Sequence, residues 1–221
     1  VDGQDYLRHC REEVKSWSYM KSPYLKRLGP EQGWYRVGPL ARLNVVDFIP
    51  TPLAQKEFEA FKAATGGKPN DMCMHTHWAR LIEVLHAAEK MRELLQDPDV
   101  LGGDLVVHGK RQPEGVGIIE APRGTLFHHY AVGDDDLIKM ANLIVSTTNN
   151  NEPMNRAVRC VATTYMAGQK EITEPMMNAV EVAIRAYDPC LSCATHAYGQ
   201  MPLEITLVDA TGAVVARRRK N

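Results

Sequence analysis

The chain has 221 residues, of which 26 are Lys or Arg and 27 are Asp or Glu, so its formal net charge at pH 7 is −1. Hydrophobic residues make up 44% and charged residues 24% of the sequence, which excludes a disordered chain and predicts one large or two small globular domains. The near-zero charge argues against a general nucleic-acid-binding protein. No stretch of about 20 mostly apolar residues is present, so no membrane-spanning helix is expected.

The N-terminal third shows two helical patterns separated by a loop. Residues 3–27 begin with apolar residues at helical spacing, whereas residues 28–52 are rich in Gly and Pro and indicate a loop. Thr51 followed by Pro52 is typical of an N-cap with proline at the first helical position. A helix is therefore predicted over residues 53–64.

The clearest helical pattern covers residues 72–95. Apolar residues recur there at every third or fourth position: Met74, Trp78, Leu81, Leu85, Ala88, Met91 and Leu95. One such stripe predicts an amphipathic helix. The period then changes, and residues 115–145 are typical of a small antiparallel sheet of three strands, with a turn at Pro122–Gly124.

The C-terminal third predicts two helices and a hairpin. The helices are expected near residues 150–167 and 173–187. Residues 203–217 alternate around Thr211–Gly212, which favours a β-hairpin. The predicted fold class is α+β, mostly helical, with a small antiparallel sheet and a C-terminal β-hairpin.

The most specific local motif is Asp188-Pro-Cys-Leu-Ser-Cys-Ala-Thr-His196. Two thiolates three residues apart can bind one metal, and His196 is a third donor three residues further on. The residues alone leave open a structural zinc site, a dithiol redox pair and a catalytic metal centre. A zinc site would have to recruit a distant ligand such as Cys73 or Cys160. Scattered, odd-numbered cysteines favour a reducing compartment over a disulfide framework.

A second motif is Glu120-Ala-Pro-Arg-Gly-Thr-Leu-Phe-His-His129. Arg123 is permanently charged, and a turn built by Pro122 and Gly124 would aim its planar fork of donors at an anion or a polarised ligand. The alternative is an ordinary surface hairpin turn.

The remaining polar features have structural interpretations. His75 and His77 are predicted to be capping or surface groups at the start of a helix. The ten methionines are predicted to fill the core, and the basic residues 217–220 to be a solvated end. Three further cysteines are predicted to be small core residues in helices: Cys10, Cys73 and Cys160.

Together, four segments resemble one family. Residues 188–196 are similar to the C-terminal metal-binding signature of nickel–iron hydrogenase large subunits, and residues 120–128 are similar to that family's arginine turn. Two further segments resemble the same proteins, Tyr35-Arg-Val-Gly-Pro-Leu-Ala-Arg-Leu-Asn44 and Ala141-Asn-Leu-Ile-Val-Ser-Thr-Thr-Asn-Asn150. The similarity is greatest to the cytosolic, bidirectional, NAD-reducing group, and it covers nearly the whole chain in the right order.

The resemblance implies a role for each matching residue. Cys190 would be a terminal nickel ligand, Cys193 would bridge nickel and iron, and His196 would bind a separate magnesium or iron ion. Arg123 would overhang the metals near the vacant site and an iron-bound cyanide. Four more residues would complete the site: Pro122 and Asp188, which shape its canopy, and Ser146 or Thr147, one of which donates a hydrogen bond to a cyanide.

Two departures from the family pattern set further expectations. The family's first cysteine pair, R-x-C-G-x-C, and a nearby acidic residue are absent, so the chain resembles only the C-terminal part of the large subunits and should be inactive alone. In the family, the mature chain ends at the motif histidine after proteolysis. Residues 1–196 would therefore be the hydrogenase portion, and 197–221 an extension removed between His196 and Ala197, as in an unprocessed precursor.

The implied function is reversible splitting of H₂, with electrons passed to NAD through partner subunits. The implied cofactor is a nickel–iron centre with CO and cyanide on iron, and no NAD or flavin is expected on this chain itself. The expected partners are a small iron–sulfur subunit, diaphorase-type NAD/flavin subunits, a maturation protease and nickel chaperones, with no nucleic acid and no membrane. A cytoplasmic location follows from the same resemblance.

Two other interpretations remain open from the sequence. One is a non-catalytic, zinc- or thiol-stabilised binding module that uses Cys190, Cys193 and His196. The other is a protein like those of respiratory complex I that share the fold but lack the active site. Retention of the cysteine pair argues against the second.

Overall fold

The computed structural model describes residues 3–190 and 202–220. The chain forms two compact units. The first comprises Val1–Gln4 and Val37–Leu143, and the second comprises Asp5–Arg36 and Ile144–Asn221. The two units are described separately below.

Three helices form the core of the first unit: α3 (Pro39–Val45), α4 (Pro52–Ala63) and α5 (His75–Leu94). The α4 and α5 helices confirm the predictions for residues 53–64 and 72–95. Helix α3 was not expected, because its segment was predicted to be a loop. Its Gly38-Pro39 start places proline in the first turn, where a missing N–H costs no hydrogen bond. Leu40 and Leu43 of α3 belong to the same buried core cluster as Phe58 and Phe61 of α4.

The predicted start of α4 is correct, but a different residue caps it. Thr51 is the N-cap, yet its hydroxyl bonds the Nδ1 atom of His86 at 2.9 Å instead of the helix backbone. The carboxylate of Glu89, on α5, accepts hydrogen bonds from the N–H groups of Leu53 (3.1 Å) and Ala54 (2.9 Å). Glu89 therefore satisfies two of the donors that a helix start leaves unpaired.

Replacing Glu89 by Gln is expected to lower the melting temperature at neutral pH. Burial raises the pKa of Glu89, but the hydrogen bonds from Ala54 and Leu53 outweigh burial and lower the pKa overall. A lowered pKa in the folded state means that the carboxylate stabilises the fold above the unfolded-state pKa of about 4.3, and that this stabilisation is lost as the pH falls through the folded-state value.

Circular dichroism melts at a series of pH values test this expectation. The difference between Glu89→Gln and the unaltered chain should be largest near pH 7 and should shrink below about pH 4. Glu93→Gln is the matched control, because Glu93 lies on the same helix and only pairs with Lys90 on the surface. Equal effects of the two substitutions at pH 7 would contradict the capping role.

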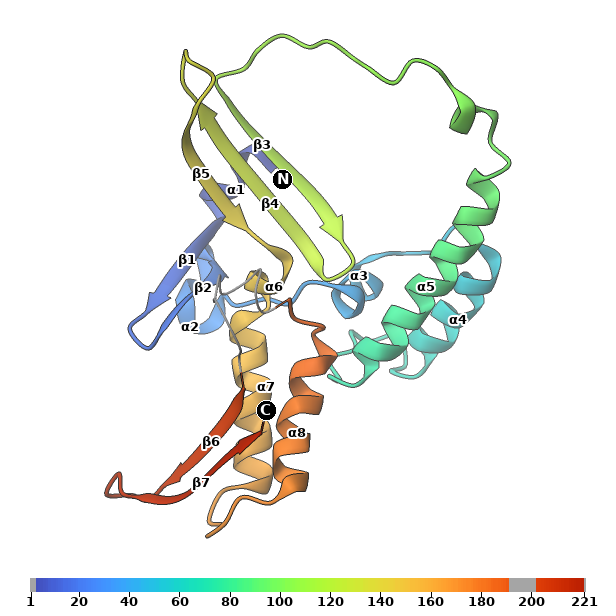
Figure 1. The fold of residues 1–221 in the computed structure, drawn as a ribbon. Helices are drawn as coiled ribbons and strands as arrows, with labels where there is room; N and C mark the ends of the chain where they lie inside the picture. Colours follow the sequence, from blue (N-terminus) through green and yellow to red (C-terminus); the bar gives the residue numbers. More distant parts are fainter. Residues whose placement is uncertain (1–2, 191–201, 221) are drawn as a thin grey trace. The chain divides into compact units, whose positions relative to one another are not determined.

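The predicted sheet is present in the first unit. Strands β3 (Glu114–Ala121), β4 (Gly124–Val132) and β5 (Ile138–Ile144) form an antiparallel order β3-β4-β5 (Figure 1). Ala121 pairs with Gly124, so Pro122 and Arg123 are the two residues of the connecting turn. A short 3₁₀ helix (Pro98–Leu101) lies between α5 and this sheet.

The second unit begins with a hairpin, which corrects the helix expected over residues 3–27. Gly3–Asp5 and Tyr6–His9 (α1) form short helices, and β1 (Cys10–Lys15) then pairs with β2 (Ser18–Leu25). The apolar residues behind the helical prediction span too few turns to distinguish the two periods, and strand pairing decides the outcome. Two short helices follow, Lys26–Leu28 and α2 (Gly29–Gln32).

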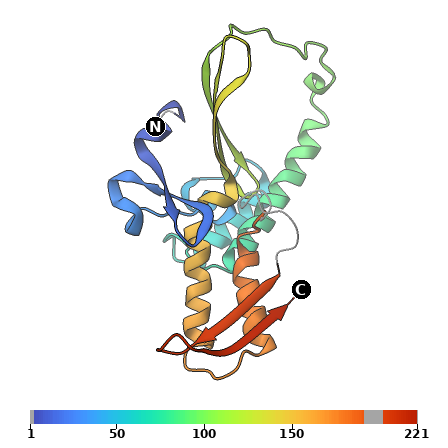
Figure 2. The same ribbon diagram turned by 60° about the vertical axis from the view of Figure 1, so that its left-hand side comes forward.

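The remainder of the second unit is a helical pair that confirms the two predicted helices. A short helix α6 (Ser146–Asn149) leads into α7 (Asn151–Tyr165), and α8 (Glu174–Ala186) lies beside α7 (Figure 2). The buried face of α8 is apolar, with Met177 1% and Val180 4% exposed. Such burial is worth about 1.5–3 kcal/mol for each large side chain.

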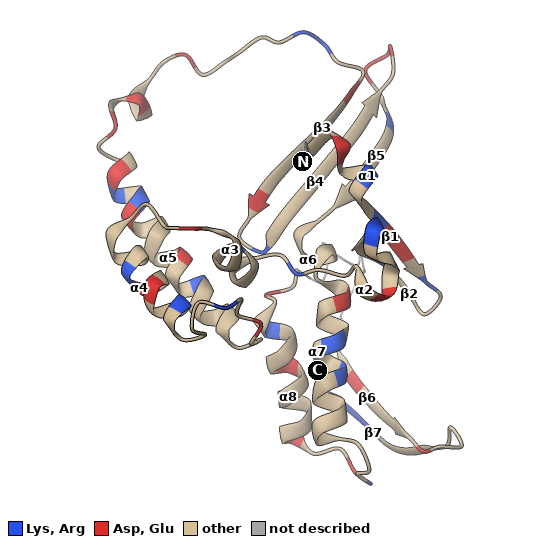
Figure 3. Ribbon diagram, turned by 180° about the vertical axis from the view of Figure 1, so that it is seen from behind, with Lys and Arg blue, Asp and Glu red and all other residues tan. Residues whose placement is uncertain are grey.

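The predicted C-terminal hairpin is also present, as β6 (Leu203–Val208) and β7 (Val214–Lys220). Residues 217–219 of its basic end are exposed as predicted, but the end also makes polar contacts with α8 and with the segment just before it. Arg218 bonds Glu174 (3.1 Å) and the carbonyl of Ile172 (2.9 Å), and Lys220 pairs with Glu181 (3.2 Å). Figure 3 shows acidic positions on α8 and basic positions on β7 within this unit.

Two expectations about buried residues are wrong. Cys160 lies on α7 as predicted but is exposed, and Cys10 is half-buried on a strand. On α5, Ala79 and Ile82 form the buried face, while Leu81 of the predicted stripe is 66% exposed. The predicted fold class, α+β with a small antiparallel sheet and a C-terminal hairpin, is confirmed.

Candidate metal centre

The Arg123 turn is packed against the segment that begins α3. Gly38 has φ +100°, and a Cβ at this position would lie 2.9 Å from the carbonyl oxygen of Arg123. Gly124 has φ +131°, and its Cβ would lie 2.2 Å from a methyl group of Val37. Both positions therefore require glycine for conformation and for space. The structure thus brings residues 37–44 of one motif together with residues 120–128 of another in the first unit.

The other two motifs meet in the second unit. The backbone N–H of Cys190 donates a hydrogen bond to the Oγ1 atom of Thr147, at 3.1 Å. Thr147 and Ser146 begin α6 and are buried, at 4% and 8% exposed. Three asparagines that follow are 2% exposed or less: Asn149, Asn150 and Asn151. The backbone of the candidate ligand Cys190 is therefore hydrogen-bonded to a buried segment, residues 146–151, in which every side chain is polar.

Asp188 turns the chain from α8 toward Cys190. It follows Tyr187, the C-cap of α8, and has φ +50°, a left-handed conformation that Asp adopts more readily than most residues. The hydroxyl of Tyr187 donates to the carbonyl of Pro153 on α7, at 3.2 Å, and so holds this end of α8. The sequence identified Asp188 but gave no signal for Tyr187.

A second network supports α6. The hydroxyl of Tyr35 donates to Oδ1 of Asn149 at 2.6 Å, and Tyr35 is also bonded to Cys10. Burial raises the pKa of the Tyr35 hydroxyl, and the nearby Cys10 and Glu12 raise it further. Burial likewise raises the pKa of the Cys10 thiol. Both groups are therefore neutral at pH 7 and act through hydrogen bonds. Tyr35 and Asn149 each lie near the end of a recognised motif, which is the only signal that the sequence offers for this contact.

Several predicted site residues are not tested by these contacts. Cys193, His196 and Ala197 lie outside the described residues. Arg123 and Pro122 belong to the first unit, whereas Cys190 belongs to the second. Within residues 3–190 and 202–220, no group of three or more His, Cys, Asp or Glu side chains is arranged to hold a metal. Among the same residues, no helix is long and apolar enough to cross a membrane.

The two histidines at the start of α5 were predicted to be capping or surface groups, but both are half-buried and neither side chain caps the helix, whose N-cap is Met74. Nδ1 of His75 bonds the Asn70 side chain at 2.7 Å, and its ring contacts Trp78. His77 bonds Arg80 at 3.0 Å.

Comparison with known proteins decides the family. The nickel-dependent hydrogenase family matches residues 2–196. The chain belongs to the nickel-dependent hydrogenase family. It is 57% identical, over 99% of its length, to the NAD-reducing hydrogenase HoxS subunit beta of Cupriavidus necator, and 43% identical, over 96%, to a chain of the F420-non-reducing hydrogenase of Archaeoglobus profundus.

The solved structures agree with the sequence relatives. A crystal structure of an NAD⁺-reducing [NiFe]-hydrogenase in the H₂-reduced state matches 89% of this chain with a TM-score of 0.84 and 52% identity, and the matched part is 43% of that chain. The two sequence relatives are each covered over 46% of their length. This hydrogenase chain thus spans about half the length of its curated relatives and corresponds to the C-terminal part of a large subunit.

Proposed function

We propose that this chain is the metal-binding part of the catalytic subunit of a nickel–iron hydrogenase that splits H₂ reversibly into protons and electrons. The observation that carries the proposal is the 3.1 Å hydrogen bond from Cys190 N–H to Thr147 Oγ1. It joins the backbone of the first cysteine of the Cys-x-x-Cys-x-x-His motif to the buried hydroxyl of Thr147, which follows the buried Ser146. The zinc-module alternative gives no reason for this pairing, nor for the family match.

The described residues fit a nickel–iron centre. A cysteine thiolate is the soft ligand that suits such a metal, and Cys190 supplies one. Buried hydroxyls suit small anionic ligands, because an unpaired cyanide nitrogen in a dry site would be costly. The proposed set is completed by Cys193 and, at a separate magnesium or iron ion, by His196.

When bound, the nickel–iron centre supplies the Lewis-acid and redox chemistry of H₂ cleavage, and the protein positions charge around it. The Thr147 hydroxyl accepts from Cys190 N–H, which leaves its own hydrogen available to donate to a cyanide. Of the two candidates, this bond favours Thr147 over Ser146. The role proposed for the Arg123 guanidinium is to stabilise negative charge that develops at the centre. Pro122 and Asp188 fix the two backbone turns that carry Arg123 and Cys190.

The proposed partners follow from the same family. One relative is named as part of an NAD-reducing hydrogenase, which supports two kinds of partner: diaphorase-type NAD/flavin subunits and a small iron–sulfur subunit. Electrons would leave through them, and this chain would bind neither NAD nor flavin. A nickel chaperone and a maturation protease would load and process the protein. A cytoplasmic location fits the supply of NAD and a compartment that keeps thiols reduced.

We also propose that residues 197–221 are an extension that is removed after His196. The family match ends at residue 196. Polar contacts through Arg218 and Lys220 attach the hairpin in this segment to α8, and no residue of β6 or β7 is fully buried. A cavity of about 850 Å³ remains between β6 and the end of α7. A segment held in this way can be released without opening an apolar core.

Metal analysis of the complete enzyme tests the function. Purified with its partners and matured, the protein should contain nickel and iron and should support H₂-dependent NAD reduction, and the 221-residue chain alone should not. Cys190→Ala should remove nickel and activity together, whereas Cys160→Ala is the matched control, since Cys160 is an exposed thiol on α7. Zinc without nickel, or nickel retained in Cys190→Ala, would overturn the proposal.

A further inference from the structure

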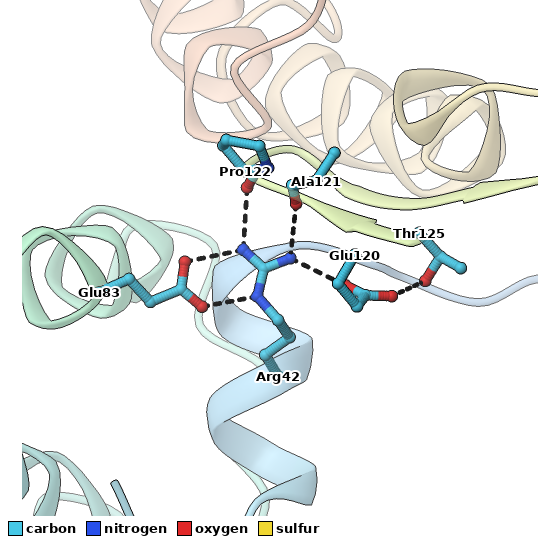
Figure 4. Close-up of polar contacts among 6 residues, drawn as sticks. All are labelled: Arg42, Glu83, Glu120, Ala121, Pro122 and Thr125. Atoms are coloured by element: carbon cyan, nitrogen blue, oxygen red, sulfur yellow. Dashed lines mark hydrogen bonds and ion pairs between the residues drawn. The ribbon is translucent and has the colours of Figure 1, made fainter. Parts of the chain in front are cut away.

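The guanidinium of Arg42 donates hydrogen bonds from all three of its nitrogen atoms to groups of the first unit (Figure 4). Its Nε and Nη2 atoms bond the two carboxylate oxygens of Glu83, at 2.6 and 2.7 Å. Its Nη1 atom bonds Glu120 at 2.9 Å. The same Nη1 atom donates to the carbonyl of Ala121, and Nη2 donates to the carbonyl of Pro122, both at 2.9 Å. One side chain thus makes five hydrogen bonds.

These bonds connect three elements at the base of one turn. Arg42 lies on α3, Glu83 on α5, and the two carbonyls immediately precede Arg123. The Glu83 carboxylate accepts in a bidentate manner, which orients the plane of the guanidinium. The carbonyls at Ala121 and Pro122 are then fixed in position, and the direction in which the chain enters Arg123 is fixed with them. Thr125, on the far side of the turn, donates to Glu120 and closes the network.

The contacts of Arg42 are better suited to positioning the Arg123 turn than to stabilising the fold. Glu120 is 47% and Glu83 26% exposed, and ion pairs that are partly exposed contribute only about 0–1 kcal/mol to folding. Burial lowers the pKa of Arg42, but Glu83 and Glu120 outweigh burial, so the guanidinium keeps its charge. A planar, permanently charged fork is the side chain that can bind a carboxylate and two carbonyls at once.

We infer that Arg42, held by Glu83, is a positioning residue that orients Arg123, the residue proposed to act at the metal centre. The inference rests on the proposed function, in which Arg123 acts at that centre. The contacts of Arg42 are made to two carboxylates and to the backbone of the turn. Its effect on the reaction therefore passes through Arg123, and displacement of such a group by about 1 Å can cost up to about 10²-fold in rate.

The first test uses the chain without metals. In Arg42→Lys, the ammonium keeps the charge but cannot bind Glu83 in a bidentate manner and both carbonyls together. Amide hydrogen exchange in the peptide that covers residues 119–126 should become faster. The control is Arg111→Lys. Arg111 bonds Asp136 and the carbonyl of Gly133, which lie in the turn between β4 and β5 and not in the turn that carries Arg123. Unchanged exchange at residues 119–126 in Arg42→Lys would overturn the inference.

The second test uses the mature enzyme. Arg42→Lys and the milder Glu83→Gln should lower kcat about tenfold or more, leave nickel and iron bound, and shift the cyanide stretching bands in the infrared. In the double variant Arg42→Lys/Arg123→Lys, the first substitution should add little to the second, because both act on one group. Additive losses, or unchanged infrared bands, would overturn the inference.

The two proposals fail in different ways. If Arg123→Lys alone has no effect on turnover, the role of Arg123 in the proposed function is wrong. If Arg123→Lys lowers turnover while Arg42→Lys and Glu83→Gln do not, the proposed function stands and the positioning role of Arg42 is wrong.

Discussion

Replacing Arg123 by Lys in the complete enzyme is expected to lower H₂ oxidation about 10²- to 10³-fold, the range seen when one fixed donor is removed from an active site. Lys keeps the positive charge but presents a point charge on a flexible stem instead of a planar fork. The backbone should not change, because Pro122 and Gly124 set the turn and the Arg42 contacts are made to main-chain carbonyls. Nickel and iron should therefore stay bound.

Three measurements on one preparation check this expectation: metal content, turnover with H₂, and the melting temperature. Arg111→Lys serves again as the control at the other end of the sheet and should keep full turnover. Near-full activity in Arg123→Lys would show that the guanidinium has no catalytic role. Loss of nickel would show that Arg123 holds the fold of the site and does not act on the reaction.

The elements that the sequence predicted well are those whose pattern is long or has a local signal. The stripe over residues 72–95 spans many turns, and Thr51-Pro52 marks a helix start by itself. The N-terminal hairpin was missed because its strands are short and Pro23 stands inside β2, where proline usually argues against a strand. Pairing with β1, a non-local contact, outweighs that preference.

The α5 helix shows a second limit of periodicity. A period identifies a helix, but the buried face depends on which elements pack against it. Ala79 is fully buried and Leu81 is 66% exposed, although the sequence favoured Leu81. Small residues such as Ala79 permit close approach of α3 and α4, whereas a hydropathy pattern gives most weight to the larger residue.

In the candidate site, too, local signals were found from the sequence and non-local contacts were not. The motif residues Arg123, Asp188 and Cys190 were identified from local sequence, because resemblance to a family is local. Arg42 and Glu83 were not identified, since Arg42 lies 41 positions from Glu83 and 79 from Ala121. No local pattern encodes a contact over such separations, and only the fold brings the partners together.

Mass spectrometry of the protein from its own host, with the maturation machinery intact, is expected to show a chain that ends at His196. Residues 197–221 carry four basic and two acidic residues, so their removal changes the formal net charge of the chain from −1 to −3 and should also shift its elution in ion exchange. The uncleaved form should accumulate when nickel is withheld, because metal binding and ordering of the site are coupled.

The contacts of the hairpin predict how the uncleaved form behaves. Arg218 and Lys220 bind Glu174 and Glu181 on α8, so Glu174→Gln/Glu181→Gln should loosen the hairpin and speed limited proteolysis of residues 203–220 in the nickel-free precursor. Ion pairs of this exposure are screened by salt, and high salt should produce a similar change in the unaltered chain.

Glu171→Gln, at an exposed position just before α8, is the control and should leave the rate of proteolysis unchanged. A mature, active enzyme that still carries residues 217–221 would contradict the processing proposal, whereas an unchanged proteolysis rate in the double variant would contradict only the electrostatic attachment of the hairpin.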